Sequence, residues 1–105
     1  MNKYDDAPRT LLVGWTILVV DDHEDSQEII ADILTFYGAN VVFANDGKEG
    51  FAKAIEIQPK FIISDIAMPN LDGWGFIELI KGDSRTANIP TIALTAHAMV
   101  GDREK

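Results

Sequence analysis

Two short apolar runs that end in carboxylates constrain the fold of this chain more than any other feature. Residues 17–20 (ILVV) lead directly into Asp21 and Asp22, and residues 61–64 (FIIS) lead into Asp65. Short, mostly apolar runs of this kind are typical of strands buried on both faces, as in parallel sheets. Two such strands side by side place three carboxylates in one crevice, at the sheet edge where open α/β sheets bind ligands.

Helical and strand patterns alternate along the rest of the chain. Apolar residues recur at helical intervals over residues 29–37 and 51–55 and again over 74–80, while residues 41–43 and 91–95 have strand composition. The first two helices are expected to end near Gly38 and Pro59. The aspartates that precede the helices stand where N-caps are expected, the first two with a capping-box glutamate three residues later: Asp25, Asp46 and Asp72.

Strands that alternate with helices require a mainly parallel α/β sheet with right-handed crossovers. The length of 105 residues is enough for one domain with one core. Residues 1–10 are polar, but Leu11, Leu12, Val13 and Trp15 are expected to pack against protein surface. We therefore expect an N-terminal extension over residues 1–15 and a single domain over residues 16–105.

Composition excludes several classes of function. A net charge of -8 and a pI near 4.5 provide no basic surface for nucleic acid and no attraction to anionic lipid. The chain has no cysteine, which excludes disulfides and thiolate sites and fits a reducing cytoplasm. The apolar run over residues 11–20 is shorter than the about 20 residues that span a bilayer. We expect a cytoplasmic protein without membrane insertion or direct nucleic-acid binding.

The three carboxylates of the sheet edge need a positive partner. Two carboxylates about 4 Å apart repel by about 4 kcal/mol at an effective dielectric of about 20, so Asp21, Asp22 and Asp65 require a cation or a shifted pKa. We expect an all-oxygen ligand set without imidazole or thiolate, which favours Mg²⁺ and a site that handles phosphate. Helix capping explains these three residues poorly, because Asp25 already serves as the cap and Asp65 precedes a proline-containing loop.

Thr95 ends the fourth expected strand, so its hydroxyl can enter the same crevice and bond a phosphoryl oxygen. A threonine in a strand is usually explained by β propensity alone. Its place at the end of residues 92–94, before the small Ala96, favours a role in the site. His97 is a weaker candidate, because it is more simply a loop residue than a ligand.

Three separated motifs resemble the receiver domain of two-component response regulators. They are residues 17–22 (ILVVDD), 64–73 (SDIAMPNLDG) and 93–96 (ALTA), in the same order as in that family. The resemblance runs from about Thr16 to the last residue. It implies a flavodoxin-like, doubly wound parallel α/β sheet with four of its strands in the order 2-1-3-4.

The resemblance also implies a mechanism in which the protein is a phosphoacceptor and not an enzyme. Asp65 would accept a phosphoryl group from a phosphohistidine on a sensor histidine kinase or a histidine phosphotransfer protein. Asp22, Asp65 and the backbone carbonyl of Ala67 would hold Mg²⁺, with Asp21 acting mostly through a bound water. Thr95 would bond the acyl phosphate and shift the loop after the fourth strand, which gives a two-state switch.

The sequence departs from the family pattern near its last residue. Receivers have a fifth strand with a lysine that contacts the phosphoryl group, followed by a fifth helix, and this sequence stops at Lys105 before either. We therefore expect an incomplete sheet whose fourth strand is an exposed edge. Such edges recruit other strands, so a homo-oligomer through this edge is expected.

Three other functions stay open at this point. A Mg²⁺-dependent aspartyl phosphatase would carry a second aspartate two positions after its nucleophile, where this chain has Ala67. An oligomeric binding or inhibitory module would use the incomplete sheet edge without switching. A flavin-binding protein of similar topology would place a phosphate group beside the acidic loop after Val20, which would repel it.

Overall fold

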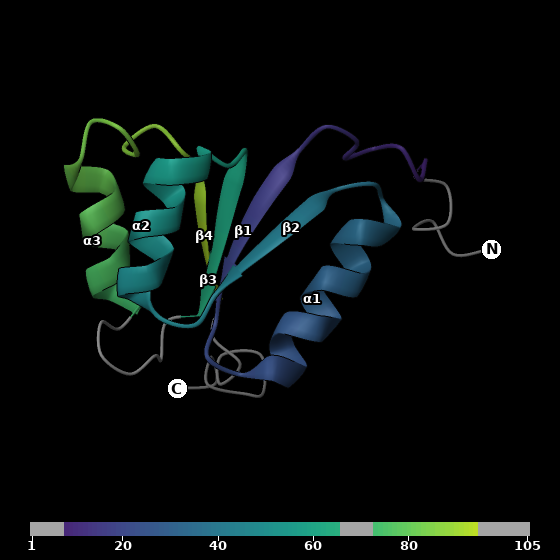
Figure 1. Ribbon diagram of the computed structural model, residues 1–105, viewed down its shortest axis with the longest axis horizontal. Helices are drawn as coiled ribbons and strands as arrows, with labels where there is room; N and C mark the ends of the chain where they lie inside the picture. The colour runs from purple at the N-terminus through teal and green to yellow at the C-terminus, as the bar shows by residue number, and fades with distance from the viewer. Residues whose placement is uncertain (1–7, 66–72, 95–105) are drawn as a thin grey trace, which may run out of the picture.

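The computed structural model describes residues 8–65 and 73–94 (Figure 1). Within these residues, parallel strands form one sheet in the order β2-β1-β3-β4. The strands are β1 (Thr16–Val20), β2 (Asn40–Ala44), β3 (Phe61–Asp65) and β4 (Thr91–Leu94). The helices are α1 (Glu24–Phe36), α2 (Gly47–Ile57) and α3 (Gly73–Gly82). Helix α1 covers one face of the sheet and α2 and α3 cover the other, which confirms the doubly wound fold and its strand order.

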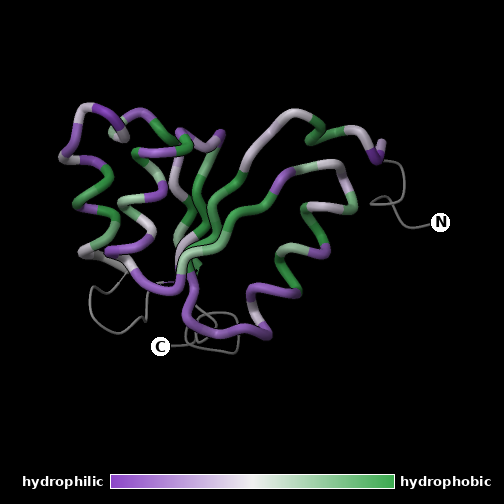
Figure 2. Tube along the Cα trace, viewed as in Figure 1, coloured by the Kyte–Doolittle hydropathy of each residue, from purple (hydrophilic) through white to green (hydrophobic). Residues whose placement is uncertain are grey.

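Of the two central strands, β1 is buried as its composition predicts, whereas β3 is fully buried only at Ile62 and Ser64. All four residues from Ile17 to Val20 in β1 are fully buried, because β1 lies between β2 and β3 with helices on both faces. On the side of α2 and α3, the sheet packs against Phe76 and Ile80. On the side of α1, it packs against Ile30 and Leu34. Figure 2 shows the hydrophobic strands passing into a hydrophilic turn after β1.

The register of the sheet places Asp21 and Asp65 at the same level along the two central strands. Val20, the last residue of β1, is paired with Ser64 of β3. Asp21 and Asp65 are the next residues along the two strands, so they leave the sheet at the same level and at its carboxyl edge. The backbone N–H of Asp21 still donates to the carbonyl oxygen of Ala44 at 3.0 Å, which holds the start of the turn against β2.

The prediction that Asp25 caps the first helix is wrong. Helix α1 begins at Glu24, its N-cap is His23, and no side chain accepts a capping hydrogen bond. The physical reason lies in the preceding turn, where a carboxylate oxygen of Asp21 accepts the backbone N–H of His23 at 2.8 Å. The chain therefore turns directly after β1, and the carbonyl of His23 already accepts the backbone N–H of Gln27 at 3.1 Å.

The predicted cap of the second helix is confirmed. Asp46 is the N-cap of α2, and its side chain accepts the backbone N–H of Glu49 at 2.9 Å. Glu49 reaches back to accept the backbone N–H of Asn45, the residue before the N-cap, at 2.8 Å, which is a variant of the capping box. The third predicted cap, Asp72, lies outside the described residues.

The described part of the N-terminal segment lies against the C-terminal end of α1 and the start of the sheet. Leu12 packs into the cluster beneath α1, and its backbone N–H donates to the carbonyl of Tyr37 at 2.8 Å. The ring of Trp15 meets that of Phe61 edge to face, with centroids 5.9 Å apart. Leu11 is 55% exposed, so the packing expected for this segment holds for only some of its apolar residues. The division of the chain at residue 15 stays a prediction.

Gly38 ends the first helical segment as predicted, and the reason is both conformational and steric. Its φ of +97° lies in the left-handed region that favours glycine. A Cβ at this position would lie 2.5 Å from Cγ2 of Val13.

No helix within the described residues is long and apolar enough to span a membrane.

Candidate functional site

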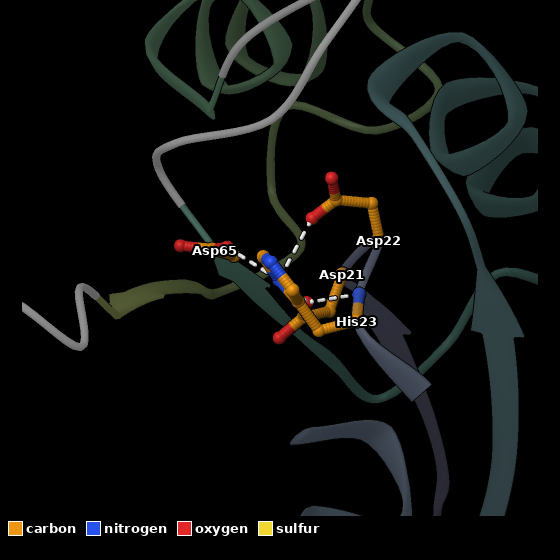
Figure 3. Close-up of side chains that lie close together, drawn as sticks. All are labelled: Asp21, Asp22, His23 and Asp65. Atoms are coloured by element: carbon orange, nitrogen blue, oxygen red, sulfur yellow. Dashed lines mark hydrogen bonds and ion pairs between the residues drawn. The ribbon is translucent and has the colours of Figure 1, made fainter. Parts of the chain in front are cut away.

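The three carboxylates predicted to share a crevice do come together at the carboxyl edge of the sheet. Asp21 and Asp22 follow β1, and Asp65 is the last residue of β3. A fourth side chain, His23, joins them, and its ring lies among the three carboxylates (Figure 3). One ligand atom from each of the four residues can be chosen so that all lie within 4.8 Å of one another. The cluster therefore has the size of a single cation site.

Burial decreases from the floor of this acidic cluster to its rim. The side chain of Asp21 is 9% exposed and that of Asp65 is 16% exposed. The side chain of Asp22 is 26% exposed and that of His23 is 65% exposed. The two inner carboxylates are thus poorly hydrated, which strengthens their mutual repulsion and their attraction for a cation.

His23 is a residue that the sequence analysis missed, because it expected a ligand set without imidazole. Nδ1 of His23 lies 3.0 Å from Oδ1 of Asp22, 3.3 Å from Oδ1 of Asp21 and 3.9 Å from Oδ2 of Asp65. The hydrogen bond to Asp21, followed by the charge of Asp22, raises the pKa of the imidazole above its ordinary value. The available signal was simple, since His23 directly follows the acidic pair in the sequence.

Gln27 is the second residue that sequence reasoning missed. It is a buried residue of α1, and its Nε2 donates to the carbonyl oxygen of Asp21 at 2.5 Å and to Oδ1 of Asn45 at 3.1 Å. These two bonds join the turn after β1 to the turn after β2. Gln27 therefore fixes the backbone from which Asp21 and Asp22 project, without reaching the cluster itself.

Other predicted site residues lie outside the described residues. These are Ala67 and Thr95; His97, which the sequence favours as a loop residue, also lies outside them. Leu94, the residue before Thr95, is the register partner of Asp65. The geometry reported for the site is therefore that of Asp21, Asp22, His23 and Asp65.

The family model of the response regulator receiver domain matches residues 17–105 of this chain. The chain belongs to the response regulator receiver family. An uncharacterized 14.6 kDa protein from Leptolyngbya boryana is 38% identical over 93 residues, which are 89% of this chain and 71% of that protein. The polar-differentiation response regulator DivK from Brucella anthropi is 31% identical over 86% of this chain and 73% of its own length.

A third relative is much longer than the matched region. The DNA-binding dual master transcriptional regulator RpaA from Synechocystis sp. is 34% identical over 83% of this chain, but the match covers only 36% of that regulator. Its name says that RpaA binds DNA. The matched region of RpaA is therefore only part of that regulator.

Solved receiver structures share the fold. The N-terminal domain of a response regulator receiver protein from Methanoculleus marisnigri matches 79% of this chain and 68% of its own, with a TM-score of 0.76 and 35% identity. The receiver domain of the sensor histidine kinase PA1611 from Pseudomonas aeruginosa matches 89% of this chain and 76% of its own, with a TM-score of 0.78 and 33% identity. That structure holds a magnesium ion coordinated in its active-site cleft.

The residues of the cluster fit a hard divalent cation. Asp21, Asp22 and Asp65 supply carboxylate oxygens at the ends of two adjacent strands, and Asp21 and Asp65 are largely withdrawn from water. Such a ligand set suits Mg²⁺, which binds to one or two carboxylates and retains open positions for water and phosphate oxygens. The acidic cluster at the carboxyl edge of the sheet is therefore suited to joining a cation to a phosphate group.

Proposed function

We propose that this chain is a phosphoacceptor that receives a phosphoryl group on Asp65 with the help of Mg²⁺. The donor is a phosphohistidine on a sensor histidine kinase or a histidine phosphotransfer protein. The observation that carries the proposal is the convergence of Asp21, Asp22 and Asp65 within 4.8 Å at the carboxyl edge of a receiver-family sheet. A phosphohistidine donor and the absence of cysteine both fit a cytoplasmic location.

Asp65 is the nucleophile, because it ends a strand beside the acidic pair while keeping a partly exposed carboxylate. One of its oxygens attacks the phosphorus in line, the new O–P bond forms, and the N–P bond of the phosphohistidine breaks. The electron pair of the broken bond stays on the imidazole of the donor. The product is an acyl phosphate on Asp65.

Bound Mg²⁺ would neutralise the incoming phosphoryl oxygens and the cluster. Asp22 and Asp65 are its proposed carboxylate ligands, with the backbone carbonyl of Ala67, while Asp21 acts mostly through a water. Asp21 is the most buried of the three carboxylates, which suits a residue that attracts the ion by its negative charge without binding it directly. Thr95 is the proposed hydrogen-bond donor to the acyl phosphate, and its movement would report phosphorylation to a partner.

Intact mass after treatment with acetyl phosphate tests this function. We expect the mass of one phosphoryl group to be added in the presence of Mg²⁺ and not in excess chelator. Asp65→Asn should remain unlabelled, whereas Asp32→Asn, an exposed site on α1, should label like the unmodified chain. Labelling that persists in Asp65→Asn would refute the assignment of the acceptor.

A second proposal concerns self-association through β4. Among the described residues β4 pairs only with β3, and the side chains of Ile92 and Leu94 are 47% and 36% exposed. A second copy that aligns its own β4 there would extend the sheet and cover both residues. Analytical ultracentrifugation at micromolar concentration should show dimers, and Ile92→Lys should shift them to monomers. Monomers in the unmodified chain would contradict this proposal.

A further inference from the structure

The imidazole of His23 gives the acidic cluster a nitrogen donor. His23 is held in place from its backbone, since its N–H donates to Oδ1 of Asp21 at 2.8 Å and its φ and ψ are those of an extended N-cap residue. Its Nδ1, the ring nitrogen nearer the backbone, is directed at the carboxylates (Figure 3). The side chain is 65% exposed, so the ring lies on the solvent side of the cluster.

The distances between donors match those around one six-coordinate ion. Adjacent ligands of an octahedral ion with bonds of about 2.1 Å lie about 3 Å apart, and opposite ligands lie about 4.2 Å apart. Nδ1 of His23 is 3.0 Å from Asp22 Oδ1 and 3.3 Å from Asp21 Oδ1, which are separations of adjacent ligands. Its distance of 3.9 Å from Asp65 Oδ2 is still within the span of one ion.

We infer that His23 is a protein ligand of the cation in this cluster, and that it makes the site favour borderline transition ions such as Ni²⁺ over Mg²⁺. This inference rests on the proposed function, because it names a further ligand and the ion preference of the same site. Imidazole suits borderline ions, whereas Mg²⁺ prefers oxygen ligands and gains little from a nitrogen donor. The consequence is a receiver site whose occupancy depends on which divalent ion is present.

The competing explanation is that His23 acts only as a counter-ion. In that case a protonated ring would pair with Asp21 and Asp22 in the metal-free protein and would be displaced by any cation. Removing the ring would then tighten the binding of Mg²⁺ and Ni²⁺ alike, because one competing positive charge is lost. A ligand role predicts the opposite sign for Ni²⁺, so the two explanations are separable by one variant.

Isothermal titration of the untagged chain with MgCl₂ or NiCl₂, at one fixed pH above the ordinary imidazole range, tests the inference. His23→Asn keeps a good N-cap residue and removes the ring nitrogen. We expect its Kd for Ni²⁺ to rise about tenfold or more, since loss of even an outer-shell partner costs a metal site about 10- to 100-fold. Its Kd for Mg²⁺ should change by less than about threefold, because the oxygen ligands remain.

His97→Asn serves as the matched control, because His97 is the only other histidine of the chain. It should bind Ni²⁺ like the unmodified chain. A loss of Ni²⁺ affinity in His97→Asn with none in His23→Asn would overturn the inference, as would equal or tighter Ni²⁺ binding by His23→Asn.

Asp22→Asn separates failure of the inference from failure of the proposed function. If Mg²⁺ binding depends on Asp22 but Ni²⁺ binding is indifferent to His23, the metal site stands and only the role of His23 is refuted. If Mg²⁺ fails to bind the unmodified chain, the proposed function fails as well.

Discussion

Asp22→Asn should stabilise the metal-free protein while abolishing its response to Mg²⁺. Asp22 faces two less exposed carboxylates, Asp21 and Asp65, and ligand atoms of all three lie within 4.8 Å of one another. At that separation one pair of charges repels by about 1 kcal/mol at the dielectric of water and by about 3.5 kcal/mol at an effective dielectric of about 20. The lost ion pair with the exposed His23 offsets little of this gain, because exposed ion pairs are screened by water.

The net gain expected for Asp22→Asn without metal is therefore about 1 to 3 kcal/mol. In a domain of this size that corresponds to a rise in melting temperature of about 5 to 15 °C. Thermal unfolding in chelator measures it, and repetition in millimolar Mg²⁺ should stabilise the unmodified chain but leave the variant unchanged. Asp32→Asn, which removes the same charge from an exposed position on α1, should change neither curve by more than a few degrees. A melting temperature of Asp22→Asn at or below that of the unmodified chain in chelator would refute the electrostatic account.

Three further predictions concern the frame that supports the site. Gly50→Ala should lower the free energy of unfolding in urea by up to about 2 kcal/mol. Its Cβ would meet buried side chains of β1 and α3 at 2.8 and 3.0 Å, and the gain in helix propensity offsets only about 1 kcal/mol of the resulting strain. Gly82→Ala, whose Cβ would meet nothing within 4 Å, should not be destabilised. The hydrogen bond from the backbone of Asn45, followed by the bond from Lys53, lowers the pKa of Glu49. The ionised Glu49 therefore stabilises the fold above its ordinary pKa of 4.5, and this stabilisation is lost as the pH falls through the pKa that Glu49 has in the folded protein. Glu49→Gln should therefore be less stable than the unmodified chain at pH 6, and the difference should shrink as the pH is lowered to 3. Equal differences at both pH values would contradict this. Gln27→Ala should cost about 1 to 2 kcal/mol in urea unfolding and weaken Mg²⁺ binding in titration, and unchanged Mg²⁺ affinity would show that the turn after β1 needs no such support.

The sequence was sufficient to predict the sheet and the meeting of its three aspartates. Runs 17–20 and 61–64 are long enough for strands only, and helices between parallel strands bring their carboxyl ends to one edge. The register then puts Asp21 level with Asp65, because Val20 pairs with Ser64. Hydrophobic pattern and chain connectivity predict the parallel sheet, the resemblance to receivers supplies the strand order that makes β1 and β3 neighbours, and the structure supplies their register.

The start of α1 could not be predicted from spacing, because two carboxylates compete for nearby backbone N–H groups. Asp25 has the spacing of an N-cap, but Asp21 lies nearer the end of β1 and accepts the N–H of His23 first. The same turn directs the ring of His23 into the acidic cluster. A two-residue difference in the helix start therefore decides whether an imidazole belongs to the site, and residue spacing does not resolve a difference of two residues.

Asp21 links the folding of this turn to the chemistry of the cluster. Its backbone N–H is bonded to Ala44, its carbonyl accepts Gln27, and its carboxylate holds the backbone N–H of His23. A carboxylate has about four lone-pair sites, so Asp21 can hold this turn and face a cation together. Its removal would disturb both the helix start and the ion site, and its effects on stability and on metal binding would not be separable. Asp22 makes none of these structural bonds among the described contacts, and its charge can be removed while the turn is kept. Because the repulsion among the three carboxylates can be relieved at Asp22 without disturbing the turn, the charge of Asp22 is the one to test.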